Sequence, residues 1–123
     1  MKALRTILLS AALLTGAVTA APTKAAVRLS TAELSLAYVE FDVGFARSST
    51  RKIAQMTPVQ KSAYVYMRSV FVNTLAEKMG LELFRTPVRV LTQTQRKAVQ
   101  AAMVATLLDA RVTKAVEAFD ATF

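Results

Sequence analysis

The sequence contains no cysteine and no histidine, and its 123 residues include three glycines. Without cysteine the chain has no disulfide, no thiol nucleophile and no N-terminal lipid attachment through sulfur. The absence of histidine removes Ser–His and Cys–His catalysis together with the commonest metal ligand. Gly44 and Gly80 are the glycines beyond the first twenty residues, and two are too few for a phosphate-binding loop. We therefore expect no metal and no cofactor.

Carboxylates are the remaining groups that could perform catalysis. The chain has eight of them, and Glu117 and Asp120 are three residues apart near its end. Two carboxylates are sufficient for glycoside hydrolysis, so a small cell-wall-degrading enzyme is formally allowed. A solvated acidic patch at a helix end is the favoured interpretation of the pair. The sequence thus predicts a protein that is not an enzyme.

The first twenty residues have the order of a secretory signal peptide. Lys2 and Arg5 precede an apolar run over residues 7–18, and small residues continue to Ala20. We expect cleavage near Ala20 or Ala21, and hence a periplasmic or secreted protein. An uncleaved membrane anchor is the alternative interpretation, although the uncharged stretch is short and diluted for a span of roughly 20 apolar residues.

The domain organisation follows from this leader. Residues 1–20 are the predicted signal peptide, residues 21–29 a flexible lead-in and residues 30–123 a single helical domain. Of the chain's 16 basic residues, loss of Lys2 and Arg5 leaves 14 against 8 acidic ones, a net charge of +6. This charge favours an anionic partner, such as an acidic protein face or, by peripheral contact, the anionic envelope. Export disfavours nucleic acid as that partner.

Helix-start patterns recur along the domain. Ser30 or Thr31 caps a first segment, with Glu33 placed for a capping box. Over residues 34–45 both a helical spacing of aromatics and a strand-like alternation are present, and the helix is preferred because a lone strand has no partner. Thr57-Pro58 starts a second helix that Gly80 closes. Its apolar residues cover nearly the whole circumference, so it should lie centrally.

A long final helix is expected from Thr92 to Phe119. One apolar stripe of this helix is predicted to face the core: Ala101, Val104, Ala105, Leu108, Val112, Ala115 and Phe119. The expected fold is therefore all-α, a small three- to four-helix antiparallel bundle that follows the signal peptide. Without disulfides such a domain relies on close packing, on a partner or on oligomerisation, and a homodimer is compatible with it.

A second sector of the final helix is the candidate partner-binding surface. It combines cations with apolar residues between them, as contact sites often do: Arg96, Lys97, Met103, Leu107, Arg111 and Lys114. The alternative is that another helix of the bundle covers Met103 and Leu107 and the cations are merely solvated.

Two helix starts share one pattern of residues. Each has an apolar residue, a threonine, two variable positions and a glutamine: Met56, Thr57 and Gln60, then Leu91, Thr92 and Gln95. The threonine caps the helix and the glutamine bonds back to it. Two independent helix starts would explain the pair. The pair also resembles the LTxxQ motif of periplasmic helical stress proteins of the Spy and CpxP type, with methionine replacing the first leucine. That resemblance implies an exported chaperone with a basic, partly apolar surface.

A second resemblance rests on the order of segments. An aromatic-rich helix over residues 64–79, a Phe84-Arg85-Thr86-Pro87 connector and the Thr92 helix start follow one another. This order is similar to small periplasmic immunity proteins that neutralise cell-wall-degrading toxins of type VI secretion. Those proteins usually carry a cysteine near the connector proline, whereas this chain has Arg85 there.

The sequence therefore predicts an exported helical protein that acts by protein–protein binding. The leading hypothesis is a chaperone or envelope-stress adaptor that binds unfolded clients. The alternative is a periplasmic immunity or inhibitor protein directed at one cell-wall-targeting toxin. The identity of the partner and the oligomeric state stay open.

Overall fold

The computed structural model describes residues 29–123, and all regular structure among them is helical. The elements are α3 (Thr31–Ser48), η1 (Ile53–Gln55), α4 (Pro58–Met79), α5 (Leu81–Arg85), η2 (Val88–Val90), α6 (Gln93–Leu108) and α7 (Ala110–Asp120). The all-helical prediction is confirmed for this part of the chain, including a helix over residues 34–45. The predicted signal peptide and all but the last residue of the lead-in lie outside the described residues. No helix within residues 29–123 has the length and apolarity needed to cross a bilayer.

Local capping chemistry sets where three helices begin. Ser30 caps α3, and its hydroxyl accepts from the Glu33 backbone N–H while the Glu33 carboxylate accepts from the Ser30 N–H. Thr57 with Gln60 caps α4 in the same way, and Thr92 with Gln95 caps α6. The structure thus confirms the capping boxes predicted at these positions. Gly80 ends α4 with a φ of 86°, a left-handed conformation that favours glycine.

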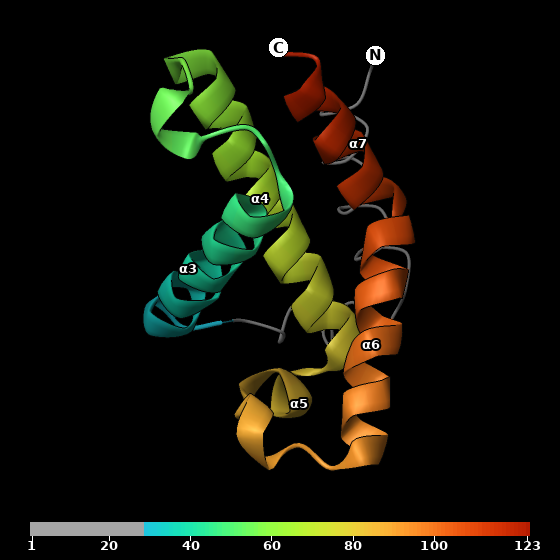
Figure 1. Ribbon diagram of the computed structural model, residues 1–123. Helices are drawn as coiled ribbons and strands as arrows, with labels where there is room; N and C mark the ends of the chain where they lie inside the picture. The colour runs from blue at the N-terminus through green and yellow to red at the C-terminus, as the bar shows by residue number, and fades with distance from the viewer. Residues whose placement is uncertain (1–28) are drawn as a thin grey trace.

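Helix α4 is the central element of the fold. It packs against α3, α5, α6 and α7, and Figure 1 shows α3 on one side of it and α6 with α7 on the other. This placement agrees with the prediction that a helix with apolar side chains on nearly every side lies centrally. The main core cluster joins α4 to α7 and consists of Tyr64, Met67, Ala115 and Phe119.

The prediction of one continuous final helix is wrong. Asp109 has an extended conformation, with φ −68° and ψ 133°, so that it ends α6 and caps α7. Its carboxylate accepts from the Arg111 backbone N–H at 2.9 Å, a bond that competes with helix continuation. The break changes which residues of the predicted core stripe face inward.

The predicted stripe is correct in α7 and wrong in α6. Val112, Ala115 and Phe119 are buried, but Ala101 and Val104 are exposed and Leu108 is 77% exposed. Ala105 is half-buried. The side chains that α6 buries are instead Ala102 and Thr106. The predicted stripe came from a helical wheel that treated residues 92–119 as one continuous helix. Asp109 interrupts that helix, so the inward-facing positions of α6 and α7 do not lie on one continuous stripe.

Candidate protein-binding site

An apolar groove lies over α4, between α3 on one side and α5 and α6 on the other. Its volume is about 390 Å³, which is within the range of pockets that accept apolar groups of a ligand. We call it the aromatic groove and define it by six of its lining residues: Phe41, Gly44, Phe45, Phe71, Phe84 and Met103. Four different helices contribute to it.

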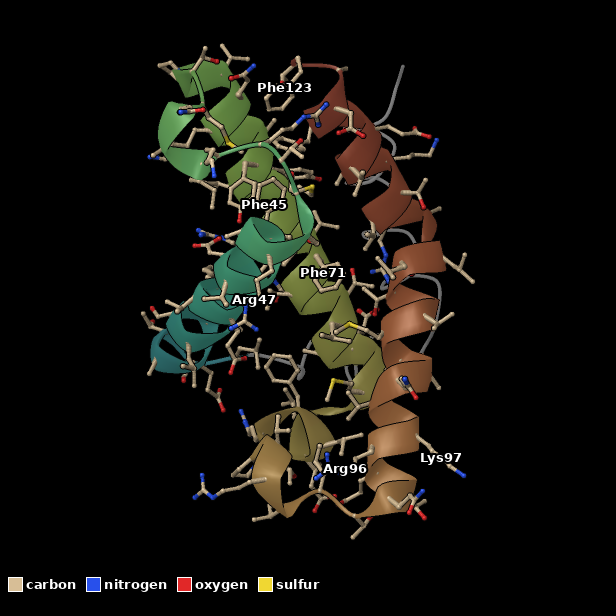
Figure 2. All side chains as sticks on the ribbon, viewed as in Figure 1. Phe45, Arg47, Phe71, Arg96, Lys97 and Phe123 are labelled. Atoms are coloured by element: carbon tan, nitrogen blue, oxygen red, sulfur yellow. The ribbon has the colours of Figure 1, made fainter. Side chains whose placement is uncertain are left out.

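Ring packing fixes the walls of the aromatic groove. The Phe41 and Phe71 ring centroids are 5.2 Å apart, and the Phe45 ring meets the Tyr64 ring edge-on at 4.9 Å. Figure 2 shows Phe45 and Phe71 close to where α3 crosses α4. Tyr64 is itself fully buried and contacts Phe119 of α7 at 5.8 Å between centroids. The base of the groove is therefore continuous with the core.

A polar cluster attaches α3 to α4 behind these rings. The Tyr64 hydroxyl donates to Asp42 Oδ1 at 2.5 Å, and Arg68 Nη1 donates to Asp42 Oδ2 at 2.9 Å. The Arg68 guanidinium also lies 4.4 Å from the Tyr38 ring centroid. Burial, with the Asp42 carboxylate as a second cause, raises the pKa of Tyr64, so its hydroxyl keeps its proton and remains a donor.

The groove continues toward α5 and η2 with a more polar character. A second depression of about 660 Å³ shares Ala37, Glu40 and Phe84 with it. At this end Arg85 donates to Glu33, with Arg85 Nη2 3.1 Å from Glu33 Oε1. These hydrogen bonds hold the pKa of the Glu33 carboxyl below its ordinary value. One end of the site is thus apolar and the other carries charges of both signs.

Gly44 lies in the groove wall, in the interior of α3. A Cβ built on it meets no atom within 4 Å, so packing inside the monomer does not require a glycine there. A glycine in a helix interior costs about 0.5–1 kcal/mol relative to alanine. This position therefore widens the groove at the expense of helix stability.

The predicted partner-binding residues do not share one helix face. Arg96, Lys97, Met103 and Leu107 belong to α6, whereas Arg111 and Lys114 belong to α7 beyond the Asp109 break. Figure 2 shows Arg96 directed toward α5 and Lys97 directed away from it. Met103 lines the aromatic groove, Leu107 is exposed and Lys114 is half-buried. The structure therefore corrects the prediction that these six residues lie in one sector of a single helix.

Arg111 is part of an ionic junction instead of an open surface. Its side chain is 14% exposed, with Nη2 2.8 Å from Glu77 Oε1 and Nε 3.0 Å from Asp109 Oδ1. Lys78 Nζ contacts the same aspartate at 3.1 Å. Hydrogen bonds from Arg111 are the largest cause that lowers the pKa of Asp109, and hydrogen bonds to Asp109 and Glu77 raise the pKa of Arg111. The junction joins the end of α4 to the start of α7.

The recurring threonine and glutamine residues act as helix caps. Gln60 Oε1 accepts from the Thr57 backbone N–H and Gln95 Oε1 from that of Thr92, each at 2.9 Å. Leu91 precedes the second box and is half-buried. In addition, Gln60 Nε2 donates to the Thr122 carbonyl at 3.1 Å, which ties the α4 start to the chain end. The shared pattern therefore has a structural role at both places.

Sequence reasoning missed the aromatic groove as a site. Phe41 and Phe45 were read only as part of the helical spacing over residues 34–45, and Phe84 as part of a connector, so nothing brought them together. One available signal was Gly44, a helix-breaking residue inside a segment with clear helical spacing. Within the described residues there is no group of three or more carboxylates, histidines or cysteines that could bind a metal ion.

Comparison with protein-family models, with curated proteins and with solved structures gives no match for this chain.

Proposed function

We propose that this chain is an exported protein, periplasmic or secreted, that binds protein clients non-covalently as a chaperone or envelope-stress adaptor. The proposal includes a signal peptide cleaved near Ala20 or Ala21 and a mature domain arranged as a small antiparallel bundle of three to four helices. The order of residues 1–20 supports export. The lack of cysteine and histidine supports binding over catalysis.

The observation that carries the proposal is the aromatic groove. Four phenylalanines and Met103 line it, and such side chains adapt to apolar surfaces of differing shape. The α3 wall from Ala37 to Ser48 is about 16 Å long at about 1.5 Å per residue. That length matches about three turns of helix. The occupant is an apolar segment of a client, such as the apolar face of an amphipathic helix.

The positive charge of the domain favours clients whose apolar segment is flanked by acidic residues. Cations are exposed on several elements: Arg47, Lys52, Lys61, Arg89, Arg96 and Lys97. The mature domain that carries them has a net charge of +6, given by 14 basic and 8 acidic residues once Lys2 and Arg5 are lost with the leader. Attraction between opposite charges accelerates encounter but contributes less to the final affinity. Apolar contacts in the groove therefore supply most of the affinity, and the cations steer the client.

Gly44 offers the sharpest test of this function. Gly44→Trp places an indole in open space within the groove, and it should weaken binding of an apolar peptide about tenfold or more, a loss of about 1.4 kcal/mol or more. Gly44→Ala is the matched control, because a methyl group leaves the groove open and stabilises α3 by about 0.5–1 kcal/mol. Peptide affinity by fluorescence anisotropy and helicity by circular dichroism would be measured for both variants.

The same pair of variants separates a chaperone from a single-target inhibitor. The wild type and Gly44→Ala should suppress aggregation of two unrelated denatured proteins, and Gly44→Trp should not. Equal suppression by the wild type and both variants would refute the groove as the client site. Failure with both clients, together with tight one-to-one binding of one folded toxin, would instead identify an immunity protein.

A further inference from the structure

Helix α6 buries small side chains and leaves larger apolar ones in solvent. The residues that it buries are Ala102 and Thr106, and its main packing partner is α4. On its outer side Val104 is 54% exposed and Leu108 is 77% exposed. The Thr106 hydroxyl donates to the Ala102 carbonyl of its own helix at 2.7 Å, so this bond does not tie α6 to α4. The observed packing of α6 therefore uses the less apolar of its two sides.

The exposed side of α6 is in phase with the buried side of α7. Val112, Ala115 and Phe119 are the residues that α7 buries. Counting back from Val112 in steps of four residues leads to Leu108 and then to Val104. If α6 continued α7 as one helix, it would rotate by about a third of a turn about its axis and direct these two large side chains toward α4.

The break between α6 and α7 depends on the interactions of one side chain. Residues 106–113 contain neither glycine nor proline, so the backbone there can adopt a continuous helix. Asp109 Oδ1 accepts from the Arg111 backbone N–H at 2.9 Å, and the same carboxylate contacts Lys78 Nζ at 3.1 Å. In a continuous helix the Arg111 N–H would bond to the Leu107 carbonyl instead. The cap and the ionic junction therefore set the break.

We propose that α6 has two registers and that Asp109 selects between them. In the observed register, the capped break holds Thr106 against α4 and Met103 in the wall of the aromatic groove. In the second register α6 and α7 form one helix, Val104 and Leu108 face α4, and Met103 turns away from it.

The second register regulates the aromatic groove, because it removes Met103 from the groove wall. A client that contacts Met103 favours the observed register, and by linkage the second register lowers the affinity for that client. Loss of the ionic junction has the opposite effect on the balance between registers. This regulation rests on the proposed function, whereas the existence of two registers does not.

Thiol reactivity at two positions of α6 reports the register. Because the chain has no cysteine, Val104→Cys and Thr106→Cys each introduce a single thiol with little change of volume. In the otherwise unchanged protein, the thiol at position 104 should react with a maleimide about tenfold faster or more than the thiol at position 106. Asp109→Ala removes the cap and the acceptor of the junction, and it should reverse this order. Asp109→Asn is the matched control, because asparagine keeps the cap, and it should leave the order unchanged.

Two results would overturn the two registers. One is an unchanged order of reactivity in Asp109→Ala. The other is fast reaction at both positions, which would mean that α6 has separated from α4. Circular dichroism should show that the helix content of Asp109→Ala is no lower than that of the wild type, as a continuous helix requires.

Fluorescence anisotropy with an apolar peptide tests the link to the aromatic groove. Asp109→Ala should bind the peptide severalfold more weakly than Asp109→Asn. Equal affinities, with the order of reactivity reversed, would overturn the regulation. A wild type that binds no peptide would contradict the proposed function instead, and the thiol measurement would still decide whether α6 has a second register.

Discussion

Helices α7 and α3 lie on opposite sides of α4, and they are attached to it by different means. Helix α7 has 11 residues and buries Val112, Ala115 and Phe119. Helix α3 has 18 residues and buries none. It is attached instead through partly buried rings and the Asp42 cluster, where one carboxylate accepts hydrogen bonds from both Tyr64 and Arg68.

This difference separates stability from binding within one small domain. Apolar side chains that are buried against α4 contribute to the folded state and offer nothing to a partner. Those of α3 remain accessible on two sides, in the aromatic groove and at Leu36, Val39 and Val43, which are exposed to solvent. A helix with weaker packing also opens at lower free energy than the core elements, as client-binding segments often do. On the proposed function, α3 is the recognition helix and α7 is the structural one.

The largest expected effect comes from breaking the polar attachment of α3. Asp42→Ala leaves the Tyr64 hydroxyl and the Arg68 guanidinium without their shared acceptor, which should lower the free energy of unfolding by about 2 kcal/mol. Chemical denaturation followed by circular dichroism measures this loss. Glu40→Ala removes an exposed carboxylate from the same helix and should change stability by less than about 0.5 kcal/mol. Equal effects of the two variants would contradict the role given to the Asp42 cluster.

A smaller and pH-dependent effect is expected on the other side of the molecule. The folded-state pKa of Asp109 lies below its ordinary value of about 4. Its charge therefore stabilises the fold above pH 4, and this contribution is lost as the pH falls toward the folded-state pKa. Asp109→Asn keeps a good helix cap but removes the charge. It should cost about 1 kcal/mol at pH 7, a typical value for a hydrogen bond to a charged partner in partial exposure.

The difference in the free energy of unfolding between wild type and Asp109→Asn should narrow as the pH falls below about 5, because the Asp109 carboxyl of the unfolded chain, with its ordinary pKa of about 4, takes up a proton there while that of the folded protein stays ionised. Urea denaturation at several pH values measures it. A gap that stays constant with pH would show that the ionic junction with Arg111 and Lys78 does not stabilise the α6–α7 side.

Local sequence determined much of the fold. The boxes at Ser30, Thr57 and Thr92 involve residues only three apart, so the helix starts could be read directly from the chain. The end of α4 at Gly80 could be predicted in the same way, since a left-handed conformation at a helix end favours glycine. The central position of α4 followed from apolar residues around its whole circumference.

Contacts between distant residues explain what the sequence did not predict. Asp109 interrupts the final helix while it bonds to Lys78 and Arg111, and Glu77 completes the junction from α4. A helical wheel of the final helix contains neither Glu77 nor Lys78, so the stripe through Leu108 was extended in the wrong phase. The aromatic groove likewise needs Phe84 and Met103 to approach α3, which only the folded chain achieves.

Hydrogen exchange with and without a bound client tests the division between α3 and α7 most directly. In the free protein we expect the amides of α3 to exchange faster than those of α7, because α3 buries none of its residues. Addition of an apolar, acidic-flanked peptide should slow exchange in α3 and leave α7 unchanged. Exchange in α3 as slow as in α7, or peptide protection confined to α6 and α7, would contradict the assignment of α3 as the recognition helix.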